Sequence, residues 1–171
     1  MTAAMYTVQH AANFFLAKGE AEQRPLSSLK LLKLVYIAYG WVLALTGKKL
    51  FEDEIQAWQH GPVVPALYHE FKHYGSAPIV ERAVCFDLDS LEFTSPEIPE
   101  SDKDTILILD RVWEAYKGYS AWSLRNKTHD VEGPWYSVYN ELERDTVIPD
   151  SVIADYFRHR IGEYLNVDQA V

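Results

Sequence analysis

The segment 27–47 constrains the fold of this chain more strongly than any other part of the sequence. Its apolar side chains occupy most of a helical circumference and leave a narrow stripe through Lys30, Lys33 and Gly40. A helix that is apolar nearly all round is usually buried at the centre of a domain. We therefore expect a core helix whose two lysines reach solvent or pair with an acidic group. The candidate acidic partners are Asp53, Glu54 and Asp130.

The rest of the chain predicts further helices joined by loops. Helical spacing and capping residues indicate helices over 7–18, 65–75, 101–117, 120–127 and 150–165. Residues 48–60 look extended, and 79–93 contains the pattern of one or two short strands inside a variable linker, 79–100, that has no assigned role. The fold class is therefore mainly α. We expect one compact domain over 1–171 around the central buried helix, with at most a few short strands.

Composition excludes several classes of function. The formal charge of −9 repels phosphate backbones, and the short lysine and arginine pairs are not interleaved with aromatic residues, so we expect no direct nucleic-acid binding. The longest apolar stretch, 34–45, is 12 residues, whereas a bilayer span needs about 20. A single cysteine, Cys85, suits a reducing compartment. With no signal segment visible, we expect a cytoplasmic chain that does not enter membranes.

The string His69-Glu70-Phe71-Lys72-His73 matches the zinc-peptidase pattern H-E-x-x-H. In such enzymes two histidines one turn apart bind zinc, and the glutamate polarises water. Helical phase, however, places His69 and His73 opposite the apolar side of the predicted helix. The positions where an extended motif needs a glycine and a third histidine hold Ser76 and Ile79. A zinc hydrolase using His69, Glu70 and His73 is therefore the disfavoured alternative.

Other catalytic patterns are weaker. Glycine-rich phosphate loops and nucleophile elbows do not occur in the sequence, and Cys85 lies in an apolar context that would raise its thiol pKa. The segment 120–130 has the residue types of a triad, but they fit helix caps and turns better; these residues are Ser120, Ser123, Thr128, His129 and Asp130. We therefore expect a protein that is not an enzyme and needs no metal or other cofactor.

Three segments together carry a more specific signal. They are KLLKLVYIAYGW from Lys30 to Trp41, LFEDEIQAWQHGPVVPALYHEFKHYG from Leu50 to Gly75, and YSAWSLRNKTHDVEGPW from Tyr119 to Trp135. In this order they resemble the Panacea domain family, which includes SocA-like antitoxins and the phage-associated protein GepA. The resemblance is strongest over 6–140. It marks the following motif residues as candidates for partner binding or for the family's packing: Lys30, Lys33, Tyr36, Trp58, Gly61, Pro62, Val63, Pro65, Tyr68, Leu124, Thr128, His129, Pro134 and Trp135.

The resemblance implies an antitoxin of a toxin–antitoxin system, which binds and neutralises a cognate protein toxin. It also implies a second role as a proteolytic adaptor that delivers the toxin to an ATP-dependent protease. The main alternative is a phage-derived regulator or adaptor that binds a host protein. For the individual residues we favour structural roles: a turn at Gly61-Pro62-Val63, packing for Trp58 and Trp135, and hydrogen bonding between segments for His129.

Overall fold

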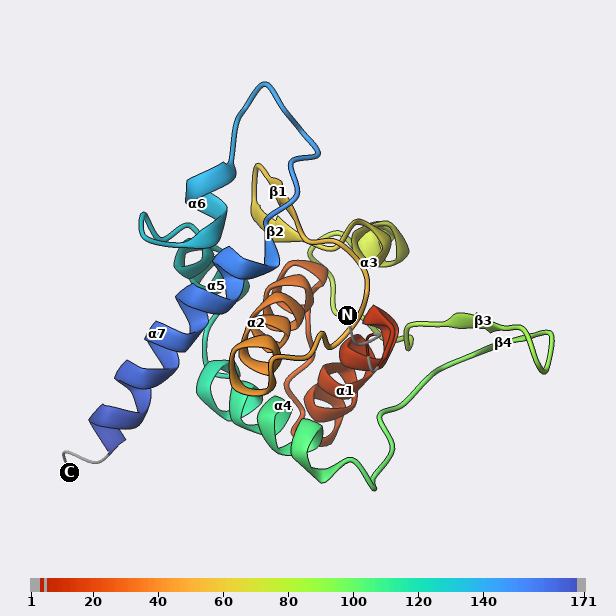
Figure 1. Cartoon of the computed structure of the whole chain (residues 1–171). Coiled ribbons are helices and arrows are strands. Elements are labelled where there is room, and N and C mark those ends of the chain that lie inside the picture. The colour runs from red at the N-terminus through yellow and green to blue at the C-terminus, as the bar shows by residue number, and fades with distance from the viewer. Residues whose placement is uncertain (1–3, 5, 169–171) are drawn as a thin grey trace.

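Helix α2 (Ser28–Thr46) lies at the centre of the molecule, and the other long helices surround it. The computed structural model describes residues 4 and 6–168, with side chains up to Glu163. Figure 1 shows α1 (Val8–Ala21), α4 (Lys103–Tyr116), α5 (Ala121–Thr128) and α7 (Asp150–Asp168) packed around α2. The expected core helix is confirmed, because 14 of the 19 residues of α2 are buried.

Helix α2 is long and apolar enough to cross a membrane by composition alone, with a mean hydropathy of 1.5. However, 72% of that apolar window is buried inside the molecule. The apolar side chains are covered by neighbouring helices, and this is how the core helix of a folded domain reaches a membrane-like hydropathy.

Short strands and helices complete the fold. The β1–β2 hairpin pairs Gln56–Trp58 with Gly61–Val63 and leads into α3 (Pro65–Phe71) and the 3-10 turn η1 (Lys72–Tyr74). A second hairpin pairs β3 (Cys85–Asp87) with β4 (Glu92–Thr94). Helix α6 (Pro134–Val138) precedes α7. The mainly α prediction is thus confirmed, with two two-stranded sheets in the described residues.

Several predicted boundaries need correction. The first helix continues past Gly19 to Ala21, and Asp102, not Ser101, caps α4 by accepting a hydrogen bond from Thr105 N. Residues 61–63, expected as a tight turn into a helix, form strand β2, because the chain reverses one step earlier at Gln59-His60. The strand at 61–63 arises from pairing with 56–58, which the spacing of residues within one segment does not reveal.

Helix α7 docks on α2 through one close approach and one polar contact. Gly40 of α2 faces the ring of Phe157, and a Cβ on Gly40 would lie 2.1 Å from that ring. At the start of α7, Asp150 accepts a hydrogen bond of 2.7 Å from the Tyr39 hydroxyl. The two helices can approach this closely only because residue 40 has no side chain.

Substituting Gly40→Ala therefore forces the Phe157 ring out of its place. We expect a loss of about 1–3 kcal/mol in the free energy of unfolding, measured by urea denaturation, because added methyl groups in a packed core cause strain. Gly162→Ala on α7 is the matched control, since nothing lies within 4 Å of its Cβ position. Alanine favours a helix interior over glycine by about 1 kcal/mol, so the control should stabilise the protein. Equal effects of the two substitutions would contradict this packing.

Candidate functional site

Several of the family-motif residues meet around the amino group of Lys33. This side chain on α2 is completely buried, and its Nζ donates a hydrogen bond of 3.0 Å to the carbonyl oxygen of Pro62 in β2. A buried ammonium group is costly unless it is hydrogen-bonded. The β1–β2 hairpin, which supplies that acceptor, therefore lies over the polar stripe of the core helix.

The expectation was wrong for Lys33, which is buried and meets no carboxylate among the described residues. Burial, aided by the nearby Arg125 charge, lowers the pKa of Lys33 to about 7. Lys30 remains partly exposed, but it does not bond any of the three acidic groups expected. Lys30 Nζ donates a hydrogen bond of 2.6 Å to the carbonyl oxygen of Lys117, at the end of α4. Both lysines thus satisfy main-chain oxygens of other segments and so join those segments to α2.

Gly61 fits this site because no other residue leaves enough room. Its φ of +107° lies where L side chains are strained, and a Cβ would come within 2.8 Å of Thr128 Oγ1 and 2.9 Å of Lys33 Nζ. Thr128 Oγ1 itself donates a hydrogen bond of 2.7 Å to Arg125 O. The absence of a side chain at residue 61 lets the hairpin, α2 and α5 come into contact at one point.

His129 and Trp135 join the same hairpin to the following helices. His129 ends α5, with Nδ1 2.6 Å from Arg125 O and Nε2 3.3 Å from Gln59 O. Burial lowers the pKa of His129, although the two carbonyl contacts oppose this shift. The Trp135 indole lies with its centroid 3.8 Å from that of the His129 ring, tilted by 51°, and it donates a hydrogen bond of 2.7 Å to Trp58 O. His129 therefore links two segments, as expected.

The other motif residues have packing roles, not all of them next to Lys33. The Tyr68 ring lies 5.0 Å from that of Trp58, and the buried Tyr36 meets Phe157 at 5.6 Å. Pro65 and Pro134 occupy the first positions of α3 and α6, where the missing N–H has no helical partner in any case. Val63 and Leu124 are buried. We call the motif residues around Lys33 the motif cluster: Lys33, Trp58, Gly61, Pro62, Thr128, His129 and Trp135.

A cavity of about 420 Å³ lies beside the motif cluster, between α2, α5 and α7. Two of its charged residues are paired with each other: Asp130 accepts hydrogen bonds from Arg160 and, at 3.0 Å, from the Tyr156 hydroxyl. Burial, followed by the Asp130 charge, raises the pKa of Tyr156 to about 12. The pairing docks α7 on the body and replaces the Lys30 or Lys33 pairing expected for Asp130.

The HEFKH string, residues 69–73, is divided between helix α3 and the 3-10 turn η1. His69 and His73 are exposed, as helical phase predicts, and His73 belongs to the 3-10 turn rather than to α3. The Glu70 carboxylate accepts a hydrogen bond of 2.7 Å from Val84 N. Within the described part of the chain, no three histidine, cysteine or acidic side chains gather as a metal site would need. The glutamate here holds the base of the second hairpin.

Sequence reasoning missed one polar residue that organises the fold. Asn13 lies in α1, only 3% exposed, and its side-chain amide donates hydrogen bonds of 2.9 Å to Ala83 O and Pro96 O. Its Oδ1 accepts a hydrogen bond of 2.7 Å from Ala83 N. The only signal was a polar interruption in an apolar helical pattern, which does not identify the partner segments.

These observations describe a helical domain in which the motif residues hold segments together. The chain belongs to the antitoxin SocA-like, Panacea domain family, whose model matches residues 31–136. Antitoxin SocA of Caulobacter vibrioides (strain NA1000 / CB15N) is 35% identical to it over 152 residues, which is 86% of this chain and 80% of the relative. No solved structure matches the chain. The family resemblance seen in the three sequence segments is therefore confirmed.

The buried Lys33 predicts a particular dependence of stability on pH. Its pKa of about 7 in the folded chain lies below the ordinary lysine value of 10.5, so the unfolded chain binds more protons between these values. Stability therefore rises as pH increases from 7 towards 10.5, because the unfavourable buried charge is removed. We expect Lys33→Met to abolish this rise, measured as urea midpoints between pH 7 and 9.5.

This comparison needs Lys30→Met as its control, because Lys30 is a second lysine on the same helix whose side chain is only partly buried. The control should keep the wild-type slope between pH 7 and 9.5. Identical slopes for wild type and Lys33→Met would show that Lys33 is not the group responsible.

Proposed function

We propose that this chain is an antitoxin that binds and neutralises a cognate protein toxin in the cytoplasm. The observation that carries the proposal is the 35% identity to Antitoxin SocA, which extends over 86% of the chain. Similarity over so much of the chain includes the segments that build α2, the β1–β2 hairpin and α5. The proposal therefore concerns the whole folded body and does not depend on a single motif.

Binding, and not catalysis, is the proposed activity. The polar groups of the motif cluster already have main-chain partners: Lys33 bonds Pro62 O, His129 contacts Arg125 O and Gln59 O, and Trp135 bonds Trp58 O. Groups held in this way stabilise the fold and do not face a substrate. The net charge of −9 supports a basic protein partner, because opposite charge speeds the encounter of two proteins.

Co-expression tests the proposal directly. The open reading frame adjacent to that of this chain is induced alone, with this chain, and with a version of its gene that has an early stop codon. We expect growth to stop with the neighbour alone and to resume only with the intact chain, because the protein forms the neutralising complex. The early-stop gene separates neutralisation by protein from an effect of its RNA.

Two results would contradict the proposal. A neighbour that is harmless alone would remove the need for an antitoxin and would favour the alternative, a phage-derived regulator that binds a host protein. Rescue by the early-stop gene would show that the protein is not the neutralising agent.

A second part of the proposal is the adaptor role that the family resemblance implies, in which the chain delivers its toxin to an ATP-dependent protease. We expect co-expression to shorten the toxin's half-life after translation is blocked, and to do so only in cells that contain the protease. A half-life that is unchanged or longer in the presence of the chain would leave simple sequestration as the mechanism.

A further inference from the structure

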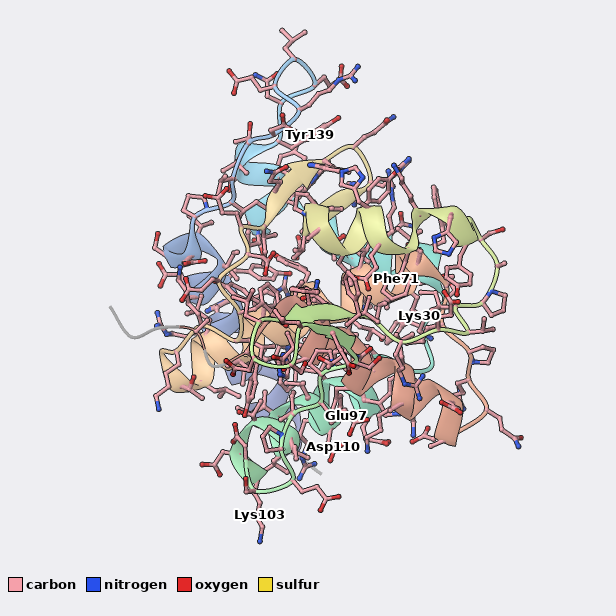
Figure 2. The ribbon with its side chains drawn as sticks, turned by 90° about the vertical axis from the view of Figure 1, so that its right-hand side faces the viewer. Lys30, Phe71, Glu97, Lys103, Asp110 and Tyr139 are labelled. Carbon is pink, nitrogen blue, oxygen red and sulfur yellow. The ribbon has the colours of Figure 1, made fainter. Side chains whose placement is uncertain are left out.

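The β3–β4 hairpin extends away from the helical body as an arm, here defined as residues 84–94. Figure 1 shows it projecting beyond α1 and α3, and Figure 2 views it nearly end-on, between Phe71 above and Glu97 below. In the described residues its strands pair only with each other, in the register Cys85–Thr94, Phe86–Phe93 and Asp87–Glu92. An isolated two-stranded hairpin is marginally stable in water, so its order needs an explanation.

The base of the arm is held firmly to the body. Asn13 bonds the main chain at both ends of the arm, at Ala83 and Pro96, and Glu70 accepts the bond from Val84 N. Ala83 itself is completely buried. The arm therefore leaves the body in a defined direction.

The tip of the arm is ordered as well. Asp87 Oδ1 accepts hydrogen bonds from Asp89 N at 2.8 Å and from Ser90 N at 3.0 Å, which closes the turn. These bonds lower the pKa of the Asp87 carboxyl. A side chain that bonds the main chain two and three residues later is a common way to fix a turn. The arm is thus preorganised at both ends, which lowers the entropic cost of binding.

The apolar face of this ordered arm has no cover. Side chains alternate along β3 and β4, so Phe86 and Phe93 share one face, where their rings meet at 5.3 Å. The opposite face carries Cys85, which lies 3.5 Å from Thr7 Oγ1 of the body. The exposed apolar side chains of the arm are Val84 (43%), Phe86 (50%), Leu88 (80%), Leu91 (70%) and Phe93 (72%). A hairpin usually turns such a face towards the core, and a contiguous exposed one marks an interaction site.

The charge around this face restricts what can cover it. The arm, residues 84–94, contains three acidic side chains, Asp87, Asp89 and Glu92, and no lysine or arginine. A second copy of the chain, with its own charge of −9, and an anionic membrane would both be repelled. A basic protein surface with an apolar cleft complements both the aromatic face and its acidic rim.

We propose that this chain binds its toxin through the arm, and that the toxin surface in contact with the arm is basic and contains an apolar cleft. The inference rests on the proposed antitoxin function. Phe86 and Phe93 fill the cleft, Leu88 and Leu91 extend the contact at the tip, and the acidic rim speeds association.

The test uses the full chain and the purified product of the adjacent open reading frame, with binding measured by calorimetry. Phe86→Ser/Phe93→Ser should weaken binding at least about tenfold, because aromatic anchors dominate interfaces. Leu107→Ser/Leu142→Ser is the matched control, since these leucines are exposed on α4 and on the loop before α7. The control should change affinity less than about twofold. All four side chains are exposed, and thermal unfolding of each variant verifies that it folds.

A second variant tests the acidic rim without altering the apolar face. Asp89→Asn/Glu92→Gln removes two exposed charges but leaves the Asp87 turn intact, and it should slow association and weaken its dependence on salt. Wild-type affinity in Phe86→Ser/Phe93→Ser, with normal neutralisation by the wild-type chain, would overturn the arm inference alone. If the wild-type chain does not bind the adjacent product, the proposed function itself fails.

Discussion

The hydrogen bond from Lys33 to the carbonyl oxygen of Pro62 is the interaction on which the rest of this structure depends. Helix α2 is so apolar that its neighbours cover it almost completely, and a single amine is then left inside the protein. The β1–β2 hairpin supplies the acceptor, and it can do so only because Gly61 has no side chain. Packing His129 and Trp135 onto that hairpin extends the contact to α5 and α6.

In this account, one part of the chain stabilises the fold and another part is proposed to bind the partner. The motif cluster builds the body, with its polar groups directed at main-chain oxygens. The arm, in contrast, is held by Asn13 and Glu70 and leaves its aromatic face uncovered. In the proposed account, the arm can therefore bind a partner without disturbing the packing of the motif cluster.

The sequence was sufficient to locate the long helices, but it did not predict helix α6 (Pro134–Val138) or the contacts between helices. The apolar circumference of α2 predicted its burial, and Ser27 and Ser120 cap α2 and α5 as local spacing indicates. The pairing of Lys33 with a carbonyl was not predictable, because its acceptor is 29 residues away. The alternation of apolar and polar residues over 84–88 indicated a strand. Whether the apolar face of that strand is covered depends on every other element, so its exposure was visible only in the structure.

Amide hydrogen exchange, measured on the free chain and on its complex with the proposed toxin, tests the central claim most directly. That claim is that the motif cluster stabilises the helical body and that the arm binds the partner. The account predicts that main-chain amides of the arm, 84–94, become more protected in the complex than in the free chain, because the bound partner covers the hairpin and suppresses its opening. Amides of the β1–β2 hairpin and α5 should be protected already and change little. New protection confined to the β1–β2 turn and α5, with the arm unchanged, would contradict it.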